Sequence, residues 1–223
     1  MSSSVKIPFA IVAGGIIIAV AVYASMPKRV QTGAGDPALV RPISASDHIL
    51  GNPTAKVLIV EYCDFDDEFC KSLDDTLHQV IASEGTNGEV AWVFREFPLT
   101  ELHPNALAHA KAAECVAQVA GNDAFWKFAN LLFANQPVDP ANYGTLAKEA
   151  NIPGEAFATC YSSESAAKPL MEHIAADRQN ALDSGAVGTP YSLIVVAGKP
   201  PIVMDGAYPY DAVKQLVNQA LGN

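Results

Sequence analysis

One stretch constrains this chain more than any other: residues 57–71, VLIVEYCDFDDEFCK. Residues 57–62 are a nearly continuous apolar and β-branched run, which is typical of a buried strand in a parallel-type position. An acidic turn follows. From Asp67 to about Ser83, apolar residues recur at intervals of three and four, which predicts a helix with one buried stripe. Asp66 or Asp67 suits the N-cap of that helix. The stretch thus predicts a strand, a tight turn and a helix N-terminus.

The rest of the chain extends this unit in a definite order. Residues 89–97 predict a second strand, and residues 103–185 show only helical patterns. Residues 191–196 and 202–204 flank a Gly/Pro turn and predict a hairpin, and residues 210–221 predict a terminal helix. The expected order is therefore β-α-β, a helical block, and β-β-α.

The N-terminus predicts a membrane segment. Residues 7–26 are apolar and uncharged, and as a helix they would span roughly 30 Å, the thickness of a bilayer's hydrocarbon core. We expect an anchor within residues 1–29. A cleaved signal peptide is the alternative, because residues 22–24 resemble a small-residue cleavage site. Residues 30–46 are rich in Gly, Pro and Ser and predict a flexible linker, and residues 47–53 an entry turn.

Composition and residue spacing exclude several function classes. The 223 residues carry a formal net charge of −10, which leaves little base for a nucleic-acid-binding face. The four cysteines show no zinc-site spacing, and the five histidines are scattered. The acidic run after residue 63 lacks the Gly and the distal Glu of an EF-hand loop. We therefore expect no metal and no nucleic-acid partner.

Several segments together resemble the DsbA-like thiol:disulfide oxidoreductases of the thioredoxin superfamily, and more narrowly their membrane-anchored bacterial branch. They are residues 47–53, 57–71, 97–99 with 103–106, 112–115, 122–133, 188–190 and 206–210. The resemblance implies an α/β, thioredoxin-like fold over residues 47–223, with an all-helical subdomain inserted at about 99–185. An N-terminal transmembrane helix would precede it.

The resemblance also exposes a departure from the family pattern. The family's turn reads Asp-Phe-x-Cys-Pro-x-Cys, whereas this chain has DFDDEFC at residues 64–70. Cys70 then matches the second, buried cysteine, and Asp67 replaces the first, nucleophilic one. Because a carboxylate cannot form a mixed disulfide, we expect impaired dithiol exchange and a peptide-binding or chaperone-like module. Asp67 acting only as a helix cap is the plainer interpretation.

Cys63 and Cys70 leave two alternatives open. Cys70 could be a shielded, inert thiol and Cys63 a small buried hydrophobe. The two could instead form a disulfide, which requires Cα atoms within about 7 Å. Because a strand end and the following helical turn lie near each other, this pairing would permit an active thiol-disulfide oxidoreductase.

Three further features take their roles from the resemblance. Glu61 matches a buried acid that moves a proton to and from the second cysteine. On a buried strand it should have a raised pKa, unless it points to a polar partner. Thr189-Pro190 resembles a cis-proline loop to which an extended client peptide adds as a strand. Cys115 and Cys160 match positions that the family often joins, and two buried thiols are the alternative.

The expected setting follows from these features. A disulfide in the helical subdomain would place the folded domain outside the cytosol, as a single-pass membrane protein with a cytoplasmic N-terminus. The expected partners are extended or unfolded client polypeptides of the cell envelope, together with the membrane itself. The resemblance implies no cofactor, and it does not identify a redox partner.

Overall fold

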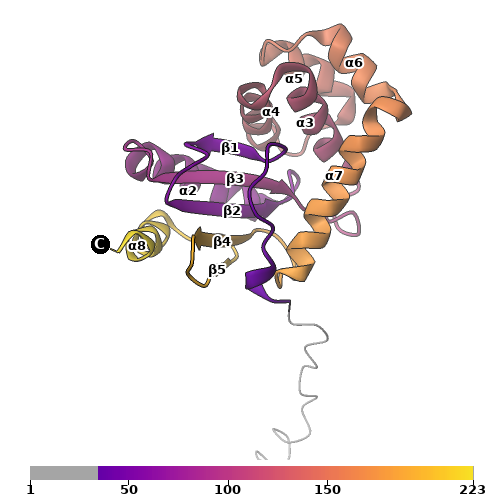
Figure 1. Cartoon of the computed structure of the whole chain (residues 1–223). Helices are drawn as coiled ribbons and strands as arrows, with labels where there is room; N and C mark the ends of the chain where they lie inside the picture. The colour runs from indigo at the N-terminus through magenta and orange to yellow at the C-terminus, as the bar shows by residue number, and fades with distance from the viewer. Residues whose placement is uncertain (1–34, 223) are drawn as a thin grey trace, which may run out of the picture. The chain divides into compact units, whose positions relative to one another are not determined.

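The computed structural model describes residues 35–222, which are built around a five-stranded mixed sheet (Figure 1). The strands are β1 (His48–Gly51), β2 (Val57–Cys63), β3 (Val90–Glu96), β4 (Tyr191–Val196) and β5 (Ile202–Asp205). Their order across the sheet is β1-β3-β2-β4-β5. Only the β2–β3 pair is parallel. The predicted interior, parallel-type position of β2 is confirmed.

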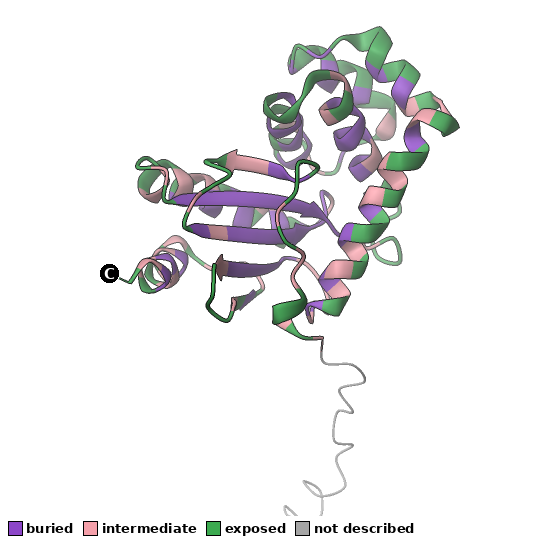
Figure 2. Cartoon of the chain, viewed as in Figure 1, coloured by how far each residue is buried: buried purple, intermediate pink, exposed green. Residues whose placement is uncertain are grey.

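The side chains of β2 alternate between two apolar cores, because successive residues of a strand point to opposite faces of the sheet. Val57, Ile59 and Cys63 belong to one core, and Val60 and Tyr62 to the other. Both faces are covered, so β2 and β3 are buried almost throughout (Figure 2). This double burial explains the absence of polar alternation in both strands.

Helix α2 (Glu68–Glu84) follows β2 directly and packs on the core that contains Cys63. Leu73, Leu77 and Val80 form its buried stripe, as the periodicity predicts. Asp67 is the N-cap: its backbone is extended, and its Oδ1 accepts the N–H of Phe69 at 2.8 Å. Such a cap contributes about 1 kcal/mol. The C-terminal helix α8 (Tyr210–Leu221) packs on the same core.

A helical block is inserted between β3 and β4, in the position that the sequence predicts. Its helices are α3 (Ala106–Ala120), α4 (Asn122–Ala134), α5 (Tyr143–Glu149), α6 (Gly154–Ser162) and α7 (Glu164–Asp183). The aromatic residues of α4 fill the space between this block and the sheet, and a Cys115–Cys160 disulfide joins α3 to α6. Helix α7 then returns along the opposite face of the sheet (Figure 1).

The structure differs from the sequence prediction near the start of the domain. A flexible linker is expected at residues 30–46, but its described part, residues 35–46, packs against α7 and the sheet. The guanidinium of Arg41 lies 2.8 Å from Asp177 and 3.2 Å from Asp47, so two ion pairs fix this segment. The predicted entry turn contains β1, a short edge strand that pairs with β3.

The predicted membrane segment, residues 7–26, lies outside the described residues. Among residues 35–222, no helix combines the length and the apolar character needed to cross a bilayer.

Candidate functional site

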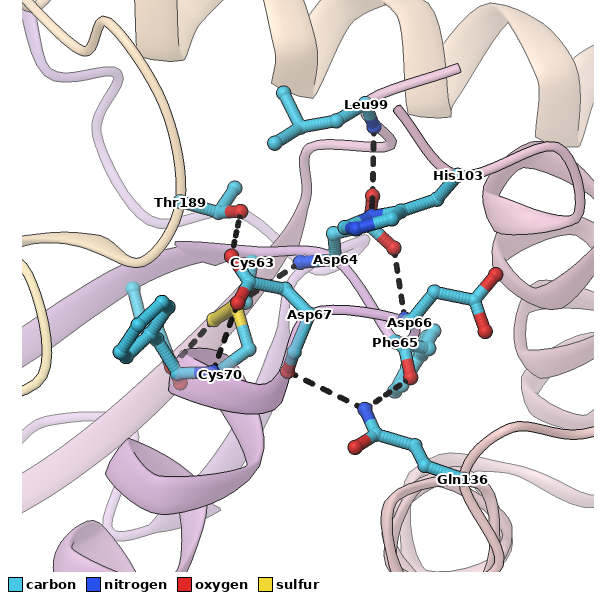
Figure 3. The surroundings of a disulfide bond; sticks show 12 residues. Cys63, Asp64, Phe65, Asp66, Asp67, Cys70, Leu99, His103, Gln136 and Thr189 are labelled. Carbon is cyan, nitrogen blue, oxygen red and sulfur yellow. Dashed lines mark hydrogen bonds and ion pairs between the residues drawn. A yellow bond between two sulfur atoms is a disulfide. The ribbon is translucent and has the colours of Figure 1, made fainter. Parts of the chain in front are cut away.

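A disulfide joins the end of β2 to the first turn of α2 (Figure 3). It links Cys63 to Cys70, with their Cα atoms 5.8 Å apart. Neither residue has any exposed surface. The backbone N–H of Asp64 donates to Sγ of Cys70 at 3.2 Å. Of the two alternatives that the sequence leaves open, the structure contains the paired one, and the pair is enclosed.

Glu61 lies beside this disulfide and is fully buried. Its Oε1 is 2.9 Å from Sγ of Cys63, and its Oε2 accepts the indole N–H of Trp92 at 2.8 Å. Burial raises the pKa of Glu61 well above its usual range, and the charge of Asp74 adds to the rise, although the Trp92 hydrogen bond opposes it. A disulfide sulfur carries no hydrogen and cannot donate to Glu61, so a hydrogen bond in this contact requires the protonated carboxyl group of Glu61.

Asp74 on α2 is a second buried acid near Glu61. Burial raises its pKa to about 7, and the neighbouring charge of His78 opposes the rise. Its Oδ1 has no hydrogen-bond partner within the described residues. Glu61 beside the disulfide and Asp74 near Glu61 therefore both hold their protons to higher pH than carboxyl groups in water.

Glu61 predicts a pH dependence of stability. Unfolded Glu61 loses its proton near pH 4.5, whereas folded Glu61 keeps it to higher pH. Above that pH the native state binds more protons than the unfolded state, so the free energy of unfolding falls as the pH rises toward the folded pKa. Glu61→Gln keeps an acceptor for Trp92 but has no titrating proton. This variant is expected to make the slope of the unfolding free energy against pH less negative, by up to about 1.4 kcal/mol per pH unit.

Denaturant unfolding at several pH values from about 5 to 8 measures this slope. Glu155→Gln is the matched control, because Glu155 is exposed on α6. Its slope should equal that of the wild type. An unchanged slope in Glu61→Gln would show that Glu61 titrates alike in the folded and unfolded chain.

The carboxylate of Asp67 connects the turn after β2 to the loop before β4. Its Oδ2 accepts a short hydrogen bond from the hydroxyl of Thr189 (Figure 3). Thr189 and Pro190 are joined by a cis peptide bond. The hydrogen bond from Thr189 places the loop that the resemblance singled out directly opposite Asp67. Only 7% of Asp67 is exposed. The two predicted elements, the turn and the Thr189-Pro190 loop, therefore meet in one site.

Three residues without a predicted role also hold the turn, namely Asp64, His103 and Gln136. Asp64 accepts the N–H of Leu99 at 2.7 Å and pairs with Nδ1 of His103 at 2.9 Å. Gln136 donates to the backbone carbonyls of Phe65 and Asp67 (Figure 3). Parallel strands bring their carboxyl ends to one edge of a sheet. The positions of Asp64 after β2 and His103 after β3 could therefore have indicated that these two residues meet. No local pattern marks Gln136.

A second polar chain runs from the turn into the helical block. Oδ1 of Asp66 lies 3.0 Å from Nε2 of His109, and Nδ1 of His109 is in a short hydrogen bond with the hydroxyl of Tyr143. Burial lowers the pKa of His109, although Asp66 opposes this, and burial raises the pKa of Tyr143. These hydrogen bonds connect the turn to α3 and α5.

Large apolar side chains are exposed on the three segments that meet here. Phe69, in the first turn of α2, is 58% exposed. Val187, two residues before Thr189, is 89% exposed, and Leu102, next to His103, is 71% exposed. Within residues 35–222, no hydrogen bond uses the backbone N–H or C=O groups of residues 187–189. The surface of the site thus offers apolar side chains and free backbone groups, while its sulfurs stay inside.

Comparison with known proteins places the chain in a family. A family model described as thioredoxin matches residues 44–195, more than half of the chain. The chain belongs to the thioredoxin family. The matched part of this thioredoxin-family chain includes Glu61, the Cys63–Cys70 disulfide, Asp67 and the Thr189-Pro190 loop.

Solved structures share the fold, including the helical insertion. BdbD from Bacillus subtilis, in its oxidised form, is 22% identical with a TM-score of 0.69, covering 85% of this chain and 98% of that one. The thiol-disulfide exchange protein alpha-DsbA2 from Wolbachia pipientis is 20% identical with a TM-score of 0.68, covering 79% and 88%. The predicted thioredoxin-like fold with an inserted helical subdomain is confirmed.

The curated relatives are much longer proteins. The Na(+)/H(+) antiporter NhaA 1 of Mycolicibacterium gilvum is 37% identical over 99 residues, which are 44% of this chain and 15% of that protein. NhaA 1 of Salinispora arenicola is 28% identical over 180 residues, which are 78% of this chain and 24% of that protein. The thioredoxin-family chain thus spans less than a quarter of the length of either antiporter.

Proposed function

We propose that this thioredoxin-family chain binds extended segments of client polypeptides beside the Thr189-Pro190 loop, and that direct dithiol exchange is impaired. The single observation that carries the proposal is a contrast in exposure. The sulfurs of Cys63 and Cys70 have no exposed surface, whereas Phe69, next to Cys70 in the chain, and Val187, two residues before Thr189, are largely exposed. A peptide-binding surface needs exposed apolar side chains, whereas a disulfide-exchange site needs an accessible sulfur.

The loop supports peptide binding by strand addition. Its backbone N–H and C=O groups at residues 187–189 have no hydrogen-bond partner within the described residues. An extended peptide would pair with these groups, and the exposed side chains of Phe69, Leu102 and Val187 would contact its alternate side chains. Burial of apolar peptide side chains there would supply most of the affinity.

Impaired exchange is supported by what occupies the helix N-terminus. In the family pattern a thiolate is stabilised at that point by the helix N-terminus. Here the carboxylate of Asp67 caps α2 and is covered by Thr189. It accepts hydrogen bonds but cannot attack a disulfide, so the first step of exchange lacks its nucleophile.

A second candidate function is thiol-disulfide exchange by the Cys63–Cys70 pair itself. The disulfide between these residues favours it, together with the buried carboxyl group of Glu61, whose Oε1 lies 2.9 Å from Sγ of Cys63. A client thiolate that attacked Cys70 would release Cys63 as a thiolate, and Glu61 would protonate it. This reaction requires the contact between Asp67 and Thr189 to open first, because both sulfurs are buried.

The proposed setting is the cell envelope. Residues 7–26 would anchor the chain with its N-terminus in the cytoplasm, and the thioredoxin-like domain would lie on the extracytoplasmic side. Two disulfides in the domain support this placement, because such bonds persist in oxidising compartments. Unfolded envelope polypeptides would then be the clients.

Peptide affinity tests the proposed function. Phe69→Ala and Val187→Ala are each expected to weaken binding of a fluorescent, cysteine-free, apolar peptide about tenfold, because each removes an exposed anchor. Fluorescence anisotropy measures the dissociation constants. Leu39→Ala is the matched control, since Leu39 is 56% exposed but lies on a separate segment, the 3-10 helix Pro37–Leu39. Equal losses in Leu39→Ala and Phe69→Ala would place binding elsewhere.

A further inference from the structure

Two histidines and a glutamate converge at a place that the proposed function does not use. His48 lies in β1, Glu114 in α3 and His173 in α7, which meet where the helical block joins the sheet (Figure 1). One potential ligand atom from each residue lies within 4.8 Å of the other two. Glu114 and His48 are buried, and His173 is partly buried. Imidazole and carboxylate groups are the ligands that zinc and related metals take from proteins.

The distances within the cluster fit one shared ion. Nε2 of His48 is 2.8 Å from Oε1 of Glu114, and Nε2 of His173 is 3.7 Å from the same oxygen. Ligands at about 2.1 Å from a tetrahedral ion lie about 3.4 Å from one another. The two measured separations bracket that value, so small side-chain movements would bring all three atoms onto one ion.

Neighbouring groups hold the ligands in these orientations. The ring of His48 stacks on Phe125, with centroids 3.6 Å apart and planes at 12°. On the other side, the carboxylate of Asp177, held by Arg41, borders the cluster 3.5 Å from Nε2 of His173. Such supporting contacts orient the ligands of protein metal sites.

A further buried carboxyl group, that of Glu96, adjoins the cluster through Asp177, whose Oδ2 accepts the backbone N–H of Glu96 at 3.3 Å. Glu96 is buried, and its Oε1 has no hydrogen-bond partner within the described residues. Burial, together with the charges of Glu114, Asp177 and Asp64, raises the pKa of Glu96 well above its usual range. A divalent cation at Glu114 would offset the negative charges that raise this pKa.

The cluster is open to solvent through a pocket of about 460 Å³. His48, Glu114 and His173 line it, together with Ala45, Gln118 and Leu170. An ion therefore has an entry path, and a water molecule has room to complete its coordination.

We propose that His48, Glu114 and His173 form a binding site for a divalent transition-metal ion of the zinc type, with a fourth position open to water. Two histidines, one glutamate and an open position form a ligand set that zinc uses in proteins. The ion would join β1, α3 and α7, and so fasten the helical block to the sheet. The three ligands come from distant segments with no local spacing, so the sequence pattern does not predict this site.

Metal titration of the full-length chain, without a histidine tag, tests this proposal. Calorimetry with Zn²⁺ is expected to show one saturable equivalent, and Zn²⁺ should raise the thermal unfolding temperature because it binds only the folded chain. His173→Gln and Glu114→Gln should each weaken binding at least about tenfold. His173→Gln is the decisive variant, since His173 is partly exposed and its loss leaves the core intact.

His78→Gln is the matched control, because His78 also lies beside a carboxylate, Asp74, but on α2 and outside the cluster. It should bind zinc as tightly as the wild type. Circular dichroism establishes that each variant is folded before titration. The proposal is overturned if folded wild-type protein binds no stoichiometric Zn²⁺, or if His173→Gln and Glu114→Gln bind it as tightly as His78→Gln.

Discussion

The double variant Asp67→Cys/Cys63→Ala is expected to oxidise a dithiol peptide at least about 100-fold faster than the wild type. The new thiol would stand at the N-cap of α2, three residues before Cys70, where the helix N-terminus favours a thiolate. Removing Cys63 frees Cys70 to pair with it. Fluorescence of a peptide substrate, followed with a small-molecule disulfide as the oxidant, measures the rate.

Asp66→Cys/Cys63→Ala is the control for this gain of activity. It places the same thiol one residue earlier, outside the cap position. This variant is expected to react little faster than the wild type. Equal rates in the two double variants would show that position 67 has no special place in the site. A wild type as fast as Asp67→Cys/Cys63→Ala would show that the existing pair already exchanges.

Removal of the Cys115–Cys160 disulfide is expected to lower the free energy of unfolding by about 4 kcal/mol, because it closes a long loop in the unfolded chain. The two residues are 45 positions apart, on α3 and α6. Removal of the Cys63–Cys70 disulfide, with a separation of 7, should cost only about 2.5 kcal/mol by the same reasoning. Cys115→Ala/Cys160→Ala and Cys63→Ala/Cys70→Ala are the variants to compare.

Urea unfolding without a reductant measures both losses, and the pair 115–160 should show the larger one. Unfolding with excess reductant is the control, since it breaks the remaining disulfides in all three proteins and should make their stabilities equal, apart from small packing losses. If Cys115→Ala/Cys160→Ala were as stable as the wild type without reductant, that disulfide would contribute nothing to the folded domain.

Much of the fold could be predicted because its signals are local. The apolar run of β2 and the stripe of Leu73, Leu77 and Val80 on α2 have clear periods, and the terminal helix begins and ends where the pattern does. Residues 35–46 could not be predicted in the same way. Their Gly/Pro-rich composition indicates a linker, but Arg41 fixes them to Asp177, 136 positions away.

The same contrast between local patterns and contacts of distant residues holds for the site. Asp67 as a helix cap and Glu61 as a buried acid follow from their places on a helix start and a buried strand. Whether Cys63 pairs with Cys70 depends on a Cα separation that no residue pattern encodes. The contacts of Asp64 with Leu99 and of Gln136 with the turn arise only when the helical block folds onto the sheet.

The central claim is that the chain binds client peptides without exchanging disulfides with them. The most direct measurement mixes the oxidised full-length protein with an extended peptide that carries two reduced cysteines, and follows both by intact mass after acid quenching. We expect saturable binding of the peptide, no mixed disulfide, and a Cys63–Cys70 bond that remains intact. If the peptide became oxidised while the Cys63–Cys70 bond was lost at the same rate, the claim would be contradicted and exchange by this pair established.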